Sequence, residues 1–461
     1  MSQELNQELN QALNRAQSCW IKDPIAILAV GAERGVVVRE GRIVELVPAG
    51  VTPAIDNPAV FEASQHVILP GLINTHHHFY QTLTRAVPAA MDRELFPWLQ
   101  ALYPVWARLT PEALDLGVTV AMAELLLSGC TTTTDHHYVF PSGLEDAVDI
   151  EVAVAKWLGM RVLLTRGSMN RSQRDGGLPP DSVVQDEDTI LADSARVVAK
   201  HHERGIDAMV QIALAPCSPF SVTSSLMRAT AELADKLDVR LHTHLAETED
   251  ENRYCEATLG CRPLDYLEQC GWLNGRTWLA HGIFFNASEM QRLGKAGTAI
   301  SHCACSNQIL ASGCCPVCDM EEAGVSIGLG VDGSASNDES NLMQEVRAAF
   351  LLQRARYGVT RVSHTDALRW ATKGSAACVG RPELGEIAVG KAADLALFKL
   401  DELRFSGHGD PIAALVLCGA HRADRVMVRG KWVVEGGAIP GLDVADLIRR
   451  HSAAARAMQA G

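Results

Sequence analysis

Residues 67–78 read VILPGLINTHHH, an apolar run at 67–74 that leads into three consecutive histidines. Seven further apolar runs follow, each separated from the next by a stretch with a helical pattern, at 131–135, 161–166, 209–215, 239–243, 277–280, 298–301 and 325–331. Apolar strands that alternate with helices are typical of a parallel sheet covered on both faces. Together the runs predict an α/β fold, a closed (β/α)8 TIM barrel. An open doubly wound sheet is the alternative, but no glycine-rich nucleotide-binding motif follows any run.

The two ends of the chain have a different pattern. Residues 35–47 (GVVVREGRIVELV) and 425–435 (RVMVRGKWVVE) each place two β-rich runs around a turn that contains glycine. We therefore expect a small β-sandwich domain formed by residues 18–64 and 385–437, and a barrel formed by residues 65–384. The remaining segment, 438–461, is expected to contain a helix at 442–458.

The net charge and the length of the apolar runs exclude some classes of binding partner. Among 461 residues, 41 are Lys or Arg and 55 are Asp or Glu, so the net charge is −14. A negative surface repels phosphates, which argues against a nucleic acid or an anionic membrane as partner. No apolar run reaches the ~18 residues of a membrane span, and the N-terminus lacks the apolar core of a secretory signal. We therefore expect a cytoplasmic protein.

The chain contains 13 cysteines, an odd number that fits reduced thiols better than a disulfide framework. Five of them crowd one stretch, at Cys303, Cys305, Cys314, Cys315 and Cys318. Four thiolates in such a cluster could hold a structural zinc ion. We favour the alternative that these cysteines pack as small apolar residues in a loop.

Polar residues at the predicted strand ends point to a metal site, because the active site of a (β/α)8 barrel lies at the C-terminal ends of its strands. His76 and His78 are two positions apart and share one face of the chain. His244 and Asp332, after the fifth and eighth runs, would complete a set of three nitrogens and one oxygen. Such a set suits Zn²⁺ with one position left open for water. Each residue alone has a structural explanation, but their joint placement favours metal binding.

These motifs resemble the amidohydrolase superfamily over nearly the whole chain. The run 69–74 (LPGLIN) leading into His76 and His78 is similar to its first-strand motif, and 244–248 (HLAET) to the H-x-x-E motif of its aminohydrolase branch. Further similar motifs are 280–282 (AHG), 301–307, 330–333 (GVDG) and 390–394 (GKAAD). Binuclear members carry a carboxylated lysine at the end of the fourth strand, where this chain reads LAPC at 214–217. The resemblance therefore implies one divalent ion, Zn²⁺ by preference.

The resemblance also implies a hydrolytic deaminase. Zn²⁺ lowers the pKa of bound water from 15.7 toward ~7 and so makes a nucleophile available. Glu247 would act as the general acid toward a ring nitrogen. Asp332 would take the proton of the attacking water and pass it to the leaving amine, and His281 would hold and polarise the attacking oxygen. The alternative for Glu247 is an ordinary surface carboxylate in an acidic run.

The sequence specifies the substrate less closely than the metal site and the type of reaction. Gln81 completes H-x-H-x-x-Q, which resembles guanine deaminases, but Cys217 stands where those enzymes have an arginine. The run 77–85 (HHFYQTLTR) is most similar to bacterial 8-oxoguanine deaminases, which implies conversion of 8-oxoguanine to urate and ammonia. The alternatives are removal of an alkylamine from a hydroxylated triazine, deamination of another aminopurine or a pterin-like ring, and, remotely, a non-catalytic scaffold.

Four residues are candidate substrate contacts. Gln81 offers a donor and an acceptor to a lactam edge. Trp98, with Tyr103 and Trp106 in the same segment, would stack on a flat ring or pack within a lid. His137 at the end of the second strand, like its neighbour His136, would contact the substrate or have a structural role, and Cys217 would face the pocket. The expected partners are a small heterocyclic substrate and further copies of the chain, as a dimer or a larger homo-oligomer.

Overall fold

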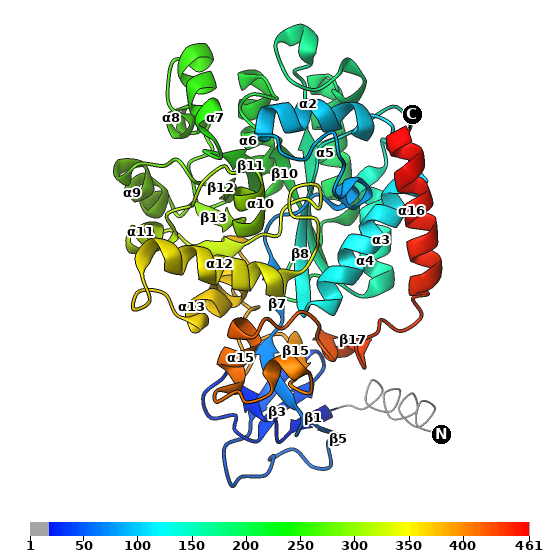
Figure 1. Ribbon diagram of the computed structural model, residues 1–461, viewed down its shortest axis with the longest axis vertical. Coiled ribbons are helices and arrows are strands. Elements are labelled where there is room, and N and C mark those ends of the chain that lie inside the picture. The colour runs from blue at the N-terminus through cyan, green and yellow to red at the C-terminus, as the bar shows by residue number, and fades with distance from the viewer. Residues whose placement is uncertain (1–17, 461) are drawn as a thin grey trace.

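The protein is described by a computed structural model over residues 18–460 (Figure 1). A closed barrel surrounded by helices forms the larger part of the molecule, and two β-sheets built from the ends of the chain lie below it (Figure 1). The polar segment 1–17 lies outside the described residues. None of the helices within 18–460 combines the length and the apolar character that crossing a bilayer requires.

Eight parallel strands close the barrel, which confirms the predicted TIM-barrel fold. In chain order they are β7 (Leu72–Asn74), β8 (Cys130–His137), β9 (Arg161–Ser168), β10 (Val210–Pro216), β11 (Leu241–Leu245), β12 (Thr277–His281), β13 (Ala299–His302) and β14 (Ile327–Leu329). The last strand returns to the first, where Leu329 pairs with Asn74. Each strand overlaps one of the eight apolar runs.

The run 67–74 differs from its expected role as one barrel strand. It divides into β6 (His66–Pro70), which pairs with β15 (Leu395–Lys399) outside the barrel, and the short barrel strand β7. Gly71 lies at the junction, where a Cβ would overlap the side chain of Thr131. The run is continuous in hydrophobicity because both sheets bury it, and only its long-range pairing reveals the division. Residues 66–70 thus belong to the terminal sheets.

The terminal sheets draw strands from both ends of the chain. One has the order β4 (Arg42–Leu46), β3 (Gly35–Arg39), β1 (Ser18–Lys22) and β5 (Ala59–Glu62). The other has the order β17 (Lys431–Glu435), β16 (Arg425–Val428), β15, β6 and β2 (Ala26–Ile27). Residues of both sheets share one buried apolar core that includes Ile21, Val36, Ile68, Leu395 and Met427.

Helices cover the outside of the barrel. The N-terminal half contains α2 (Leu95–Trp106), α3 (Pro111–Leu127), α4 (Ala147–Leu158), α5 (Glu187–His201) and α6 (Ser224–Leu237), with short helical turns η1 (Phe79–Thr84), η2 (Gln173–Asp175) and η3 (Asp181–Val183). The next part contains α7 (Glu249–Tyr254), η4 (Cys255–Leu259), α8 (Pro263–Gln269), α9 (Ala287–Ala296), α10 (Ala304–Ile309) and α11 (Val317–Glu322). The last part contains α12 (Leu342–Tyr357), α13 (His364–Arg369), η5 (Trp370–Gly374), α14 (Ser375–Cys378), η6 (Leu403–Phe405), α15 (Pro411–Leu417) and α16 (Val444–Ala460).

The C-terminal helix α16 runs along the side of the barrel beside α3 (Figure 1). Two of its side chains contact the turn η1, which follows the first strand. His451 Nε2 lies 3.2 Å from Thr82 Oγ1, and Gln459 Nε2 donates to the Leu83 carbonyl at 2.8 Å. The last helix therefore supports the segment that begins directly after His78.

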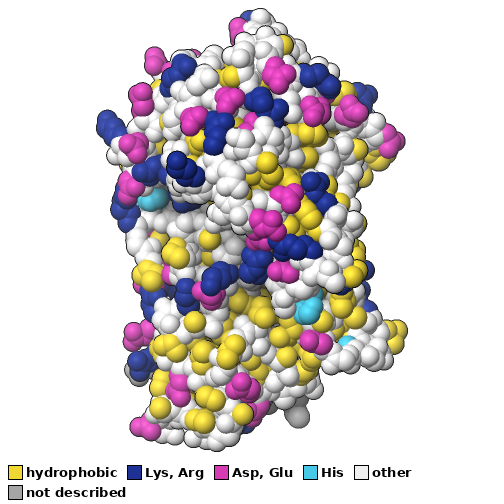
Figure 2. All heavy atoms as spheres, turned by 90° about the vertical axis from the view of Figure 1, so that its left-hand side faces the viewer, with side chains coloured by type: hydrophobic (Ala, Val, Ile, Leu, Met, Phe, Trp, Pro, Cys, Tyr) yellow, Lys and Arg dark blue, Asp and Glu magenta, His cyan; other side chains and the backbone are white. Residues whose placement is uncertain are grey.

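The surface combines charges of both signs. On the face drawn in Figure 2, acidic and basic side chains are interspersed, and apolar side chains gather toward the terminal sheets. The cysteine-rich stretch is mostly inside the protein, where Cys303, Cys315 and Cys318 are buried. Within residues 18–460, none of the side-chain groups suited to a metal ion includes a cysteine. Packing as small apolar residues accounts for them.

Candidate metal centre and active site

Five buried side chains converge at the C-terminal end of the barrel. His76 and His78 follow β7, His244 lies near the end of β11, His281 ends β12, and Asp332 follows β14. The chain has positive φ angles at two of these strand ends, 74° at His281 and 63° at Asp332. Left-handed backbone is uncommon for residues other than glycine and is concentrated at functional sites, where it redirects a side chain.

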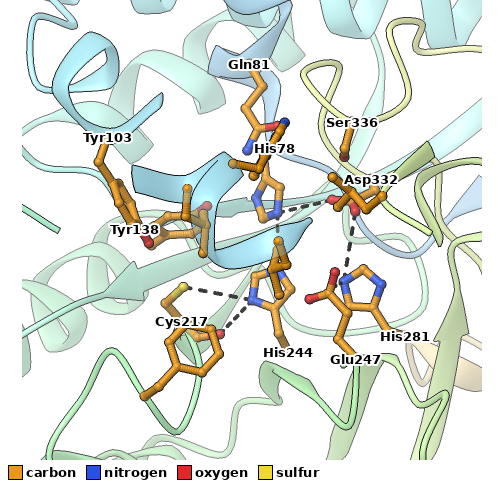
Figure 3. Close-up of a pocket in the computed structure, with 15 residues that line it drawn as sticks. His78, Gln81, Tyr103, Tyr138, Cys217, His244, Glu247, His281, Asp332 and Ser336 are labelled. Carbon is orange, nitrogen blue, oxygen red and sulfur yellow. Dashed lines mark hydrogen bonds and ion pairs between the residues drawn. The ribbon is translucent and has the colours of Figure 1, made fainter. Parts of the chain in front are cut away.

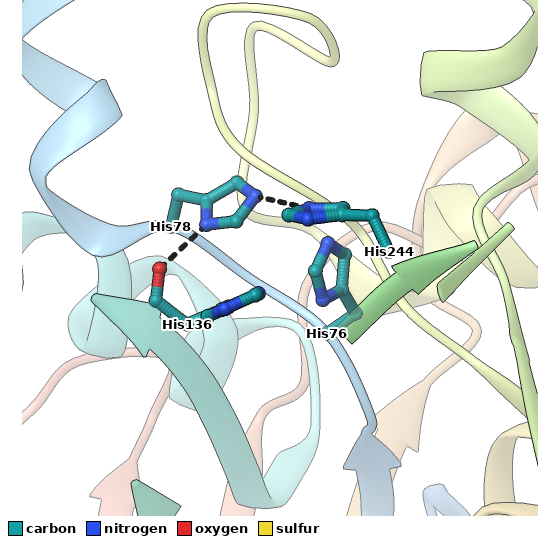
Figure 4. A group of neighbouring side chains, drawn as sticks. All are labelled: His76, His78, His136 and His244. Atoms are coloured by element: carbon teal, nitrogen blue, oxygen red, sulfur yellow. Dashed lines mark hydrogen bonds between the residues drawn. The ribbon is translucent and has the colours of Figure 1, made fainter. Parts of the chain in front are cut away.

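The four side chains that sequence spacing assigned to a metal lie close together. Asp332 Oδ1 is 3.4 Å from His76 Nε2 and 3.3 Å from His78 Nε2. His78 Nε2 is 3.2 Å from His244 Nε2, and Figure 4 shows these three imidazoles grouped together with His136. His76 Nε2 is buried and makes no hydrogen bond. A buried nitrogen without a partner, facing a carboxylate and two further imidazoles, fits a divalent metal ion.

Hydrogen bonds behind two of the imidazoles fix their orientation. His78 Nδ1 lies 2.8 Å from the His136 carbonyl, and His244 Nδ1 lies 2.6 Å from the Cys217 carbonyl. Because a carbonyl oxygen only accepts, each Nδ1 carries the hydrogen and donates it. The lone pair is left on Nε2, the nitrogen that faces the proposed metal position, which is the arrangement typical of metal-binding histidines.

His136 is an additional member of this group. Its side chain could offer a ligand atom within 4.8 Å of those of His76, His78 and His244. Its Nε2 donates to the Ala215 carbonyl at 2.9 Å, whereas Nδ1 has no hydrogen-bond partner. The His136 ring stacks on that of His244 at 4.8 Å, and we interpret it as support for this ligand.

The pKa values of Glu247 and Asp332 are shifted in opposite directions beside His281. Glu247 Oε2 lies 3.5 Å from His281 Nε2, and Asp332 Oδ2 lies 3.9 Å from the same nitrogen (Figure 3). Burial, reinforced by the charge of Asp332, raises the pKa of Glu247 well above its usual range. Burial would also raise the pKa of Asp332, but the adjacent imidazoles of His76 and His78 hold it well below its usual range. Two carboxyl groups with diverging pKa values suit one proton donor and one proton acceptor.

A pocket opens onto these groups (Figure 3). Of the residues assigned to substrate contact, Gln81, Trp98 and Cys217 line it. Gln81 Oε1 is buried and has no hydrogen-bond partner, so it is available to a ligand. A Cβ at Gly333 would overlap this oxygen, and glycine at that position therefore leaves room for the amide.

His137 is the exception among the assigned contacts, and its assignment is corrected here. Its side chain does not line the pocket, because alternate residues of β8 face opposite sides and His136 takes the inward position. His137 Nε2 instead donates to the Val139 carbonyl at 2.8 Å, and Nδ1 lies 3.3 Å from Glu151 of α4. Together with Asp135 it forms a separate, fully buried polar cluster.

Several lining residues were not singled out as substrate contacts from the sequence. They come from helix α2, from the end of β8 and from the loops after β10, β13 and β14, and they are Leu95, Leu99, Tyr138, Phe220, Leu310 and Ser336. Tyr103, predicted to stack on a flat ring, also lines the pocket, and Tyr138 carried a signal as an aromatic residue directly after β8. The others lie in loops and in helical segments after the strands, where strand periodicity gives no signal.

Comparisons with known proteins agree with this site. A model of the amidohydrolase family matches residues 67–433. The 8-oxoguanine deaminase of Pseudomonas aeruginosa is 62% identical over 445 residues, which cover 96% of this chain and 99% of that protein. The hydroxydechloroatrazine ethylaminohydrolase of Pseudomonas sp. strain ADP is 36% identical, with coverage of 90% and 89%.

The resemblance extends to solved structures. The crystal structure of an atrazine chlorohydrolase from Arthrobacter aurescens TC1 complexed with zinc matches with a TM-score of 0.89 at 29% identity, covering 95% of this chain and 100% of that one. The barrel, the buried histidine and aspartate cluster at its strand ends and the match over residues 67–433 lead to one conclusion: the chain belongs to the amidohydrolase family.

Proposed function

We propose that the protein is a zinc-dependent hydrolytic deaminase that converts 8-oxoguanine and water to urate and ammonia. The observation that carries the proposal is the 62% identity to an 8-oxoguanine deaminase over 96% of the chain. The arrangement of Glu247, His281 and Asp332 beside a donor set for a metal supports it independently.

One ion would be held by His76, His78, His244 and Asp332. Bound Zn²⁺ acts as a Lewis acid that makes water nucleophilic near neutral pH. A single ion is preferred because β10, the fourth barrel strand, ends at Pro216 without a lysine that could bridge two ions. Three imidazole nitrogens and one carboxylate oxygen suit zinc.

Glu247 supplies the first proton. Burial raises its pKa and so favours the protonated carboxyl group, which can donate to the ring nitrogen next to the attacked carbon. Its backbone N–H donates to Glu251 Oε2 at 2.9 Å, which fixes the short segment between β11 and α7. The acid is therefore held in place by a contact that does not involve its own carboxyl group.

Asp332 and His281 handle the attacking water and the leaving amine. Asn307 Oδ1 accepts from His281 Nδ1 at 2.9 Å, so His281 Nε2 is the ring nitrogen that faces the reacting groups and orients the water. Asp332, ionised at neutral pH, takes the proton of the water and passes it to the amine. The bond from C2 to oxygen forms first, as Glu247 protonates the adjacent ring nitrogen. The bond from C2 to the protonated amine then breaks while the C2 hydroxyl returns its proton to Glu247, which yields urate and ammonia.

The pocket suits a flat, polar heterocycle. Trp98, Tyr103, Tyr138 and Phe220 provide aromatic walls, and the Gln81 amide offers hydrogen bonds to a lactam edge. Burial raises the pKa of Cys217 to about 12, so its thiol is neutral in the pocket. A hydroxylated amino-triazine is the second candidate, because the ethylaminohydrolase is 36% identical over 90% of the chain.

The test is ammonia release by zinc-replete protein offered 8-oxoguanine, guanine, isocytosine and a hydroxylated amino-triazine separately at about pH 7.5. The expected result is a kcat/KM for 8-oxoguanine of at least ~10⁴ M⁻¹s⁻¹, well above the others, with urate as product. Activity on the triazine alone would overturn the assignment of 8-oxoguanine as the substrate. Zinc-loaded protein without activity on any of the four would overturn the substrate class, and protein that purifies without stoichiometric zinc would favour the scaffold alternative.

Self-association as a dimer or larger homo-oligomer and location in the cytoplasm stay predictions from the sequence. Light scattering of the purified protein measures the first of these directly.

A further inference from the structure

A fully buried histidine that takes no part in the proposed reaction lies directly behind the metal position. His242 is two residues before His244 on β11, so both side chains point into the barrel. Its Nε2 lies 2.8 Å from His76 Nδ1. His242 therefore contacts one of the proposed ligands from the side opposite to the metal.

The direction of this hydrogen bond follows from the contact that the other ring nitrogen of His242 makes. His242 Nδ1 lies 2.9 Å from the backbone carbonyl of Trp278, which can only accept, so Nδ1 carries a hydrogen. In the neutral ring the lone pair is then on Nε2. His76 Nδ1 must donate to that lone pair, which leaves the lone pair of His76 on Nε2, the unpartnered nitrogen beside Asp332.

The other two imidazole ligands are oriented by the backbone rather than by a side chain. His78 and His244 donate directly to backbone carbonyls, which no substitution removes. His76 is the ligand whose second nitrogen depends on a side chain. Its orientation is therefore the one that a single substitution at position 242 can release.

Trp278 holds His242 in turn. The two rings stack at a centroid distance of 4.4 Å with an interplanar angle of 16°. The Trp278 indole Nε1 donates to the carbonyl of Thr75, the residue before His76, at 3.0 Å. One tryptophan thus fixes both the residue that accepts from His76 and the backbone that carries His76.

We propose that His242 is a positioning residue that sets the tautomer and ring orientation of His76, so that Nε2 is its metal-binding nitrogen. The inference rests on the metal site of the proposed function and adds a specific requirement to it. Residues behind metal ligands that fix their tautomer typically contribute a factor of 10–100 in metal affinity.

The experiment compares zinc affinity, by competition with a chelator, in the wild-type protein and in three variants at position 242. His242→Leu removes the acceptor, and we expect a 10–100-fold loss of affinity. His242→Gln places an amide oxygen near the position of Nε2 and should recover most of it. His242→Asn reaches only the position of Nδ1, so it can still contact the Trp278 carbonyl but should bind zinc as weakly as the leucine variant.

His302→Leu is the matched control, because His302 is a buried barrel histidine whose ring contacts Gln353 rather than a proposed ligand. Its zinc affinity should stay within about threefold of the wild type. The absorption spectrum of the cobalt-loaded protein gives a second readout, which should change in the Leu and Asn variants and be retained in the Gln variant.

The outcomes separate the two proposals. Wild-type protein that binds no zinc would refute the metal site itself. If the wild-type protein binds zinc and the Leu and Asn variants bind it as tightly as the wild type, the role of His242 is overturned and the metal site stands. If His302→Leu loses as much zinc affinity as His242→Leu, the loss is a general effect of a core cavity, and this result would also overturn the role of His242. Should the leucine variants fail to fold, the comparison of Gln with Asn decides alone.

Discussion

Glu247 Oε2 lies 3.5 Å from His281 Nε2, at the end of the barrel where the metal ligands converge. Both side chains are buried at the base of the pocket, so the carboxyl group and the imidazole face one another with little exposure to solvent. The contact brings together a residue that follows β11 and a residue that ends β12, two neighbouring strands of the barrel.

Substitution Glu247→Gln should lower kcat by a factor of about 10²–10⁴, because the amide keeps the shape of the side chain but cannot donate an acidic proton. Zinc content should stay at the wild-type level, since Glu247 is not among the proposed ligands. Steady-state kinetics with metal analysis measure both quantities. Glu249→Gln, an exposed position two residues away, is the control and should behave as wild type. A loss of zinc in the Glu247 variant would contradict its assignment as a proton donor.

Gly333 and Gln81 should act as one unit in substrate recognition. A Cβ at Gly333 would overlap Gln81 Oε1, so Gly333→Ala should displace the amide without changing its chemistry. We expect Gly333→Ala and Gln81→Ala each to lower kcat/KM by about tenfold to a hundredfold, the usual effect of one lost buried hydrogen bond.

The double variant Gly333→Ala, Gln81→Ala tests this coupling. Because the alanine at position 81 removes the group that Gly333 accommodates, the double variant should be no worse than either single variant. Additive losses would show that Gly333 acts through the neighbouring Asp332 instead. Zinc content of all three variants distinguishes the two explanations, since a disturbed Asp332 lowers it.

The barrel was predictable because its strands are buried on both faces, so most of them appear as separate apolar runs. The strand β8 (CTTTTDHH) is also buried but consists mainly of β-branched threonine. The proximity of the proposed ligands was predictable for a related reason: His76, His78, His244 and Asp332 lie at the ends of strands that meet at one side of the barrel. The division of run 67–74 into two strands was not predictable, because β6 is distinguished from β7 only by its pairing with β15, more than 300 residues away.

His137 shows a second limit. Alternation along β8 requires that one of two adjacent histidines faces inward, but the sequence does not set which one. The structure orients His136 inward and His137 toward Glu151 on α4. Similarly, Leu310 and Ser336 reach the pocket from loop and helical segments after β13 and β14, whose course depends on packing rather than on local pattern.

A buried ion pair connects the barrel to the terminal sheets and should contribute strongly to stability. Arg161 of β9 contacts both carboxylate oxygens of Asp394, at 3.1 and 3.2 Å, and Asp394 also accepts from the backbone N–H of Arg429 at 2.7 Å. Asp394→Asn leaves the Arg161 charge buried without an opposite charge, so we expect a loss of about 3–5 kcal/mol in the free energy of unfolding.

Denaturation in urea measures this loss. The exposed pair of Arg204 and Asp238 is the control, since both side chains are more than half exposed and solvent screens their attraction. Asp238→Asn should therefore leave the urea midpoint nearly unchanged, and asparagine tolerates the positive φ of 51° at that position. Equal shifts in the two variants would show that burial does not determine the contribution of these pairs.

The buried carboxyl group of Glu151 should make stability depend on pH. Burial raises the pKa of Glu151 to about 8, whereas an unfolded chain ionises glutamate near 4.3. Between about pH 5 and pH 8 the folded protein therefore holds one proton more than the unfolded chain at this group. The free energy of unfolding should fall as pH rises through this window, by up to about 1.4 kcal/mol per unit from Glu151 alone.

Glu151→Gln removes the titrating group and should remove this contribution. The variant should gain stability relative to the wild type as pH rises from 5.5 to 7.5, because only the wild-type protein must retain a proton in order to stay folded. Urea denaturation of the zinc-free proteins at several pH values measures the difference without a contribution from metal binding. A difference that is constant over this range would show that Glu151 is already ionised in the folded protein, with its charge balanced by a protonated His137 3.3 Å away.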